Sequence, residues 1–159
     1  MSLIVKRTRT GFEAVSLETA KDYLRVLHSL EDKTIIMLIT QAREQLEAAT
    51  GLSLVEQKIE LELSDFEGVF YFPHSPIIEM QSCTIDGENV LASVIGNRLR
   101  HNKKGLLRAT YLAGGTRSGL TMAVIDLAAH LFINRGSAGI DYPQCVKRWI
   151  LQNQINMLS

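Results

Sequence analysis

The hydrophobic period of this chain changes twice, and those changes limit the folds open to it. From Ser16 to Gly51 apolar residues recur every three or four positions, which is the spacing of an amphipathic helix. After Gly51 they alternate with charged residues, which indicates strands with one buried face. Beyond Gly114 and Gly115 the helical spacing returns. This order predicts an α+β protein in which an antiparallel β subdomain is inserted into a small bundle of about four helices.

The same pattern divides the chain into three segments. Residues 1–53 are expected to form the N-terminal helical part, residues 54–115 the β insertion, and residues 116–159 the C-terminal helical part of the same bundle. A length of 159 residues suits one domain, so we expect a single domain overall.

Capping residues indicate where the first two helices begin and end. Ser16 is a suitable N-cap for the first helix, whose apolar stripe reaches Leu27. Ser29 and Asp32 have the spacing of a capping box at the start of the second helix, and Gly51 is a natural left-handed residue after its end. Glu47 falls on the side of this helix opposite its apolar stripe.

Two further helices are predicted after the β region. The first runs from Leu120 to about Asn134 with Ser118 as its cap, and the second covers Gln144–Leu158 with Pro143 in its first turn. The bundle is expected to bury a common core of Leu24, Ile35, Leu38, Ile39, Ala42, Leu46, Val124, Leu127, Ala128 and Leu131.

The β region shows clear strand and turn signals. Ile59, Leu61 and Leu63 alternate with charged residues, which predicts a strand with one buried face. Asp86 and Gly87 form a typical two-residue hairpin turn. The other expected strands cover residues 69–72, 77–85, 88–90, 94–95 and 106–112.

Charge is distributed unevenly although its sum is zero, with 17 basic and 17 acidic residues. Residues 54–94 contain one basic and eight acidic side chains, whereas residues 95–120 contain six basic and none that is acidic. Three explanations remain open: cross-strand pairing within one sheet, an acidic-to-basic contact between subunits that closes a ring, or contact of the basic segment with phosphates.

The sequence offers no catalytic, cofactor or metal site. Its histidines lack metal-binding spacing, and the His130–Asp126 spacing is typical of a surface pair. Cys145 near a helix start is expected to be a partly buried, inert thiol, and with Cys83 it suits a reducing compartment. No apolar stretch is long enough for a membrane span, and the N-terminus does not resemble a signal peptide.

Some side chains are candidates for contacts between subunits. Five apolar residues lie off the main stripes of their helices, and exposed apolar side chains that cluster mark partner surfaces. Two lysines lie in the basic segment. The candidate subunit interface is therefore Ile36, Met37, Lys103, Lys104, Leu151, Ile155 and Leu158.

Short motifs in order along the chain resemble the head–tail connector (adaptor or head-completion) family of tailed bacteriophages. The first group is Ser16–Val26, Glu31–Asp32, Ile39–Glu44, Glu47 and Thr50–Gly51. The second group resembles the long form with a β insertion that is found in prophages, and consists of Phe72–Pro73, Pro76–Ile77, Asp86–Gly87, Tyr111–Gly114 and Asn134–Arg135.

This resemblance implies a structural protein of the virion that is not an enzyme. Such a protein forms a homo-oligomeric ring below the portal protein, extends the DNA channel and docks tail-completion proteins. DNA passes through the lumen without sequence-specific binding, no membrane is involved, and assembly takes place in the bacterial host cytoplasm. The alternative is a nucleic-acid-binding accessory protein of DNA packaging, which the basic residues from Arg98 to Arg117 favour.

Overall fold

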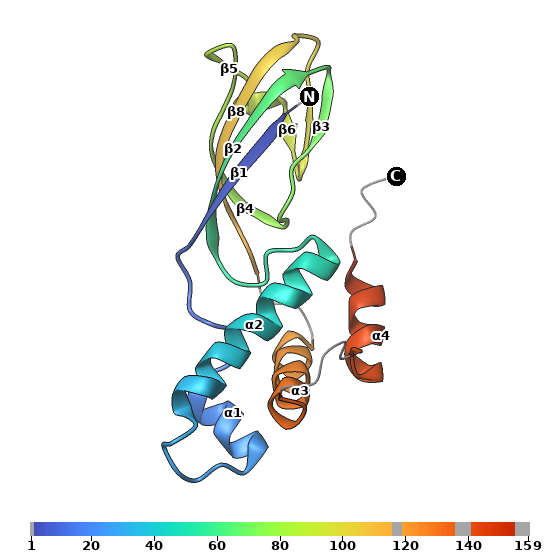
Figure 1. Ribbon diagram of the computed structural model, residues 1–159. Coiled ribbons are helices and arrows are strands. Elements are labelled where there is room, and N and C mark those ends of the chain that lie inside the picture. The colour runs from blue at the N-terminus through green and yellow to red at the C-terminus, as the bar shows by residue number, and fades with distance from the viewer. Residues whose placement is uncertain (1, 116–118, 136–140, 155–159) are drawn as a thin grey trace. The chain divides into compact units, whose positions relative to one another are not determined.

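A computed structural model describes residues 2–115, 119–135 and 141–154. Among these residues the chain divides into two compact units, a sheet unit of residues 2–12 and 51–115 and a helical unit made of the rest (Figure 1). Four helices and antiparallel sheets confirm the predicted α+β class with an inserted sheet.

The sheet unit contains two antiparallel sheets. The larger has the strand order β1 (Leu3–Arg9), β2 (Gln57–Phe66), β8 (Gly105–Ala113), β4 (Ile77–Ile85) and β5 (Glu88–Asn89). The smaller has the order β3 (Val69–Tyr71), β7 (Arg98–Arg100) and β6 (Val94–Ile95), and a short 3-10 helix, η1, covers Leu91–Ser93.

Alternation of side chains builds the core of this unit. Every second residue of β2 from Gln57 to Leu63 is buried, as the sequence predicts. The buried ring of Tyr111 packs edge-on against Phe72 at 5.4 Å, and the Tyr111 hydroxyl donates a hydrogen bond to the Pro73 carbonyl at 2.7 Å. Apolar side chains of both sheets therefore contribute to one core.

Strand β1 lies within the segment 1–53 that the sequence places in the helical part. Instead of preceding a helix directly, residues 3–9 pair with β2 in register from Leu3–Leu63 to Arg9–Gln57. Lys6, Arg7 and Arg9 obscure the apolar alternation by which strands are identified. By contrast, the predicted hairpin between β4 and β5 is present, with positive φ angles at Asp86 and Gly87.

The helical unit contains α1 (Leu17–Leu24), α2 (Asp32–Thr50), α3 (Leu120–Ile133) and α4 (Gln144–Asn153). Ser16 caps α1 as predicted, because its hydroxyl accepts a hydrogen bond from the Thr19 amide at 3.1 Å. Gly51 follows α2 with a φ of 72°. The first residue of α3 follows Gly119, whereas the predicted cap Ser118 and the end of the fourth predicted helix lie outside the described residues.

Two local predictions in this unit are wrong. Helix α1 ends at Leu24 because Arg25 adopts a left-handed conformation, so Leu27 lies in the following turn and is 96% exposed. Helix α2 begins at Asp32, which is therefore not the third residue of a capping box. Asp32 instead accepts a hydrogen bond from Lys21 Nζ at 2.6 Å, which joins α1 to the start of α2.

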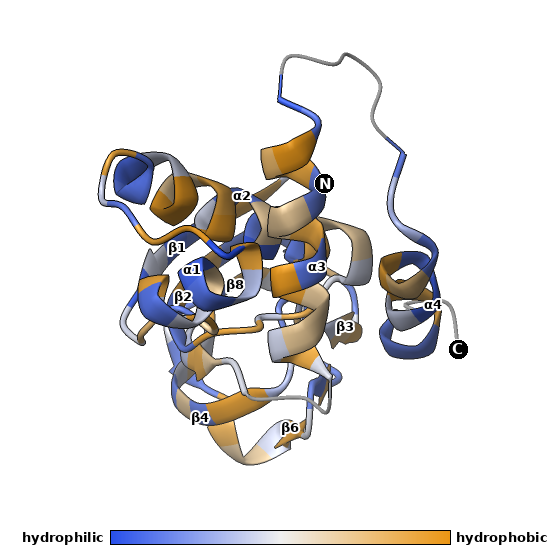
Figure 2. Cartoon of the chain, turned by 90° about the horizontal axis from the view of Figure 1, so that it is seen from below, coloured by the Kyte–Doolittle hydropathy of each residue, from blue (hydrophilic) through white to orange (hydrophobic). Residues whose placement is uncertain are grey.

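The predicted helical core is largely confirmed. Eight of its ten residues are buried, and Leu24 and Leu131 are partly exposed. Helix α3 is apolar over most of its surface (Figure 2) and has seven buried residues, which suits a central position among the helices. None of the helices in the described part of the chain is both long and apolar enough to span a membrane.

Candidate interaction surfaces

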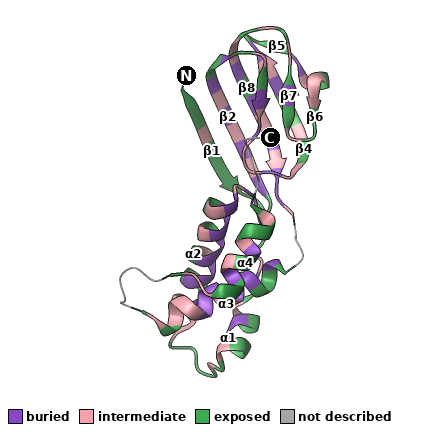
Figure 3. Cartoon of the chain, turned by 90° about the vertical axis from the view of Figure 1, so that its right-hand side faces the viewer, coloured by how far each residue is buried: buried purple, intermediate pink, exposed green. Residues whose placement is uncertain are grey.

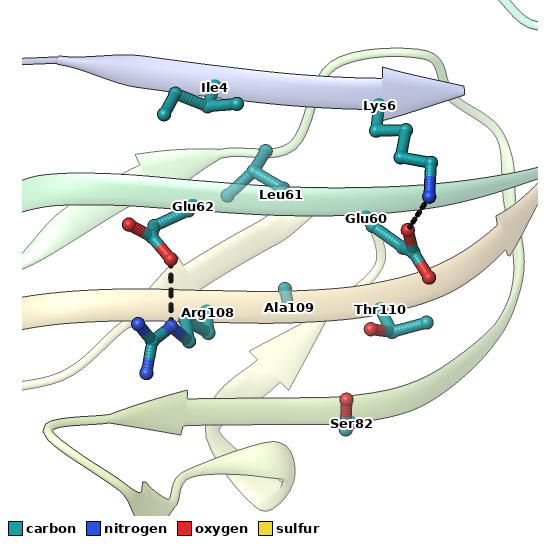
Figure 4. Close-up of a pocket in the computed structure, with 9 residues that line it drawn as sticks. All are labelled: Ile4, Lys6, Glu60, Leu61, Glu62, Ser82, Arg108, Ala109 and Thr110. Atoms are coloured by element: carbon teal, nitrogen blue, oxygen red, sulfur yellow. Dashed lines mark hydrogen bonds and ion pairs between the residues drawn. The ribbon is translucent and has the colours of Figure 1, made fainter.

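The outer face of the larger sheet carries a hollow of about 300 Å³. Four neighbouring strands, β1, β2, β8 and β4, supply its walls (Figure 4). The lining residues are Ile4, Lys6, Glu60, Leu61, Glu62, Ser82, Arg108, Ala109 and Thr110.

Charged side chains in this hollow pair with one another across the strands. Lys6 Nζ lies 3.2 Å from Glu60 Oε2, and Arg108 Nε donates to Glu62 Oε2 at 2.8 Å. Hydrogen bonds from Lys58 and then from Lys6 hold the pKa of the Glu60 carboxyl below its usual value. Each of the two glutamates is thus paired with a cation of a neighbouring strand on the exposed face of the sheet.

These pairs also explain part of the uneven charge distribution. The acidic β2 strand lies beside β8, so Glu62 meets Arg108 within one chain. Lys103 Nζ similarly lies 2.6 Å from Glu88 Oε2, whereas Lys104 is exposed in the same turn. Cross-strand pairing, the first of the three explanations, therefore accounts for the Glu62–Arg108 pair, whereas Lys103 pairs with Glu88 from the loop before β8.

The candidate interface residues that the structure describes are divided between the two units. Ile36, Met37 and Leu151 belong to the helical unit and are 49%, 60% and 76% exposed, respectively. Lys103 and Lys104 belong to the sheet unit. The remaining two candidates, Ile155 and Leu158, lie outside the described residues. The exposure of the three apolar side chains agrees with their proposed role, which stays a prediction.

A buried ionic cluster in the helical unit was missed by the sequence prediction. Glu47 is 1% exposed rather than on the polar side of α2, and Arg43 Nη1 donates to its Oε2 at 2.8 Å. Arg43 Nε also donates to Glu13 Oε2 at 2.9 Å, and Thr40 donates to the other oxygen of Glu13 at 3.1 Å. The spacing of Arg43 and Glu47, one helical turn apart, is the signal that indicates such a pair.

Electrostatics keep the Arg43 guanidinium of this cluster charged. Burial by itself lowers the pKa of the Arg43 guanidinium, but the hydrogen bond to Glu13 and the charge of Glu47 outweigh it, so the pKa is raised. The guanidinium therefore stays charged and holds the segment before α1 against α2.

Cys145 and the expected His130–Asp126 pair differ from expectation. Cys145 is exposed rather than partly buried, and desolvation followed by a hydrogen bond to Asp126 raises its thiol pKa. Asp126 accepts a hydrogen bond from the Tyr23 hydroxyl at 2.7 Å, whereas His130 contacts the Asn134 side chain. In the described ranges no group of three or more His, Cys, Asp or Glu side chains is arranged to hold a metal ion.

Chains of solved phage-like particles share this fold over almost their whole length. One, from the neck of an empty gene transfer agent (GTA) particle computed with C6 symmetry, has a TM-score of 0.76 and 17% identity, with 98% of both chains covered. Another, from the virion of a native GTA particle, has a TM-score of 0.70 and 15% identity, with 95% of both chains covered.

A third similar chain comes from the neck of a native GTA particle computed with C12 symmetry. Its TM-score is 0.67 at 16% identity, and the match covers 100% of this chain and 98% of that one. No protein-family model and no curated protein matches the sequence. At this level of identity the likeness shows a shared fold.

Proposed function

We propose that this protein is a structural head–tail connector of a tailed phage or prophage. It forms a homo-oligomeric ring below the portal protein, extends the DNA channel and docks tail-completion proteins, without catalysis. The observation that carries this proposal is the match to a neck chain of a GTA particle at a TM-score of 0.76 over 98% of both chains. The protein then belongs to the virion and is assembled in the host cytoplasm, with no membrane contact.

Two further observations support a ring. The similar neck chains belong to assemblies computed with C6 and C12 symmetry, and cyclic assemblies are built from repeated head-to-tail contacts. The exposed apolar side chains of Ile36, Met37 and Leu151 supply surface that a neighbouring subunit can bury.

Mass photometry and negative-stain electron microscopy of the purified protein, over a range of concentrations, test this function. We expect closed rings at high concentration and co-purification with a portal protein encoded in the same particle gene cluster. A protein that stays monomeric at every concentration, with and without the portal protein, contradicts the proposal.

The alternative function is that of a nucleic-acid-binding packaging accessory protein. The basic residues between Arg98 and Arg117 favour it, although Lys103 and Arg108 in that segment already pair with glutamates. A gel shift with duplex DNA at increasing salt separates the two functions, because phosphate binding falls steeply with salt concentration. A connector is expected to show little affinity for free duplex at physiological salt.

A further inference from the structure

Strand β1 is an open edge of the larger sheet. It pairs with β2 over seven residues without a register shift, and no other strand in the described part of the chain pairs with its outer side. Figure 3 shows this strand exposed along almost its whole length. A regular edge of this length is a template for pairing with another strand.

Hydrogen bonds at its two ends show which backbone groups face outward. The Ser64 amide donates to the Ser2 carbonyl at 3.0 Å, and the Thr10 amide donates to the Glu56 carbonyl at 3.0 Å. In an antiparallel pair, hydrogen-bonded positions alternate along the strand, so the even-numbered residues of β1 bond to β2. Odd-numbered residues such as Leu3 and Val5 therefore direct their N–H and C=O groups away from the sheet.

The opposite end of the same sheet is also open in the described part of the chain. Among those residues, 77–82 of β4 have only β8 as a paired strand, since β5 pairs with just Thr84 and Ile85. Two register shifts leave Ile78 and Gln81 without partners in the β8 ladder. The side chains of Ile78 and Glu79 are exposed.

We propose that β1 of one copy pairs with residues 77–82 of β4 in a second copy, so that the sheet continues from subunit to subunit around the ring. This inference rests on the proposed ring. Because β1 and β4 are separated by three antiparallel steps, they run in opposite directions. Rotation about a ring axis preserves the direction of a strand along that axis, so β1 of the next copy meets β4 in the antiparallel sense.

Charge selects β4 over a second β1 as the partner. Strand β1 contains Lys6, Arg7 and Arg9 and no acidic residue, so a second β1 brings no opposite charge to this edge. Strand β4 contains Glu79 and no basic residue. The contact is therefore between two different edges, which is the kind of contact that closes a ring.

Cross-linking tests the pairing without disturbing the edge. In a Cys145→Ser background, one preparation carries Leu3→Cys and a second, with a tag of different size, carries Gln81→Cys; Cys83 is buried and stays. With a short bismaleimide we expect a mixed cross-linked dimer when the two are assembled together, and no dimer from either variant alone. A dimer from Leu3→Cys alone, or none from an assembled mixture, overturns the proposal.

A proline variant tests the backbone groups themselves. Leu3→Pro removes an N–H that points out of the sheet, a position at which an edge strand tolerates proline, whereas Leu3→Ala shortens the side chain and keeps the N–H. We expect the midpoint concentration of assembly to rise at least about tenfold for the proline variant and less than about threefold for the alanine variant.

Thermal melting of the monomer shows whether both variants fold. If Leu3→Pro and Leu3→Ala have similar melting temperatures and assemble equally well, the inference is overturned. If rings form at the same midpoint concentration in both variants, this inference alone is overturned. If the wild-type protein never assembles, the proposed function is overturned as well.

Discussion

The guanidinium of Arg43 donates to Glu47 Oε2 across 2.8 Å, and both side chains are almost fully buried in the helical unit. The same guanidinium holds Glu13, so one cation balances two carboxylates that come from different segments of the chain. Removal of Arg43 takes its counter-charge from Glu47, which is 1% exposed.

Arg43→Ala should therefore destabilise the protein strongly. We expect a loss of about 3–5 kcal/mol in the free energy of unfolding, because Glu47 keeps its burial and loses its counter-charge. Urea denaturation followed by circular dichroism measures it. Lys6→Ala is the control, since Lys6 and Glu60 are exposed and such pairs contribute at most about 1 kcal/mol. Equal losses of unfolding free energy for Arg43→Ala and Lys6→Ala would contradict a stabilising role of the buried ionic cluster.

Leu38 and Met37 are adjacent on α2 but differ in burial. Leu38→Ala should cost about 2–5 kcal/mol, because it removes buried methyl groups and leaves a cavity. Met37→Ala should change monomer stability by less than about 0.5 kcal/mol, because its side chain is exposed. Denaturant titrations of the two variants compare them, and a near-neutral Leu38→Ala means that the buried face of α2 is misassigned.

Gly105 cannot be replaced by alanine without disturbing the turn opposite it. Its φ is +139°, and a Cβ there would lie 2.1 Å from Asp86 Oδ2, whose carboxylate accepts a hydrogen bond from the Leu106 amide. Gly105→Ala should lower stability by more than about 1 kcal/mol. Gly96→Ala, at positive φ in open space, isolates the cost of the backbone conformation. Differential scanning calorimetry should give a clearly lower melting temperature for Gly105→Ala than for Gly96→Ala.

Lys103 and Lys104 separate two of the three explanations of the basic segment, pairing within the chain and contact between subunits. If the segment contacts a neighbouring subunit, Lys104→Glu should weaken assembly at low salt and leave the melting temperature unchanged, because Lys104 is exposed. Lys103→Glu should also lower the melting temperature slightly, because it breaks the pair with Glu88. Sedimentation velocity and thermal melting should be run on both. Normal assembly of Lys104→Glu removes that residue from the interface.

The two cysteines should differ in reactivity. Burial raises the pKa of Cys83 to about 11, so its thiolate is scarce at neutral pH and shielded as well. Cys145 is exposed, but its raised pKa means that alkylation should accelerate only at alkaline pH. Mass spectrometry after iodoacetamide treatment should find one label per folded chain and two after denaturation. Two labels on the folded protein would contradict the burial of Cys83.

Strong local signals in the sequence determined most of the secondary structure. The α2 stripe, the alternation of β2 and the Asp86–Gly87 turn each combine side-chain period with a residue that fixes backbone conformation. The apolar stripe by itself predicts a first helix that reaches Leu27, but a left-handed Arg25 ends α1 at Leu24.

Only the tertiary structure decided the features on which the proposals depend. Strand β1 has little alternation of its own, and it becomes a strand because β2 offers an edge to pair with. Glu47 is polar by type, and it is buried because Arg43 supplies the counter-charge from one turn away. In both cases a partner elsewhere in the fold outweighs the local preference, since pairing satisfies backbone or charged groups that the sequence pattern alone would assign to solvent.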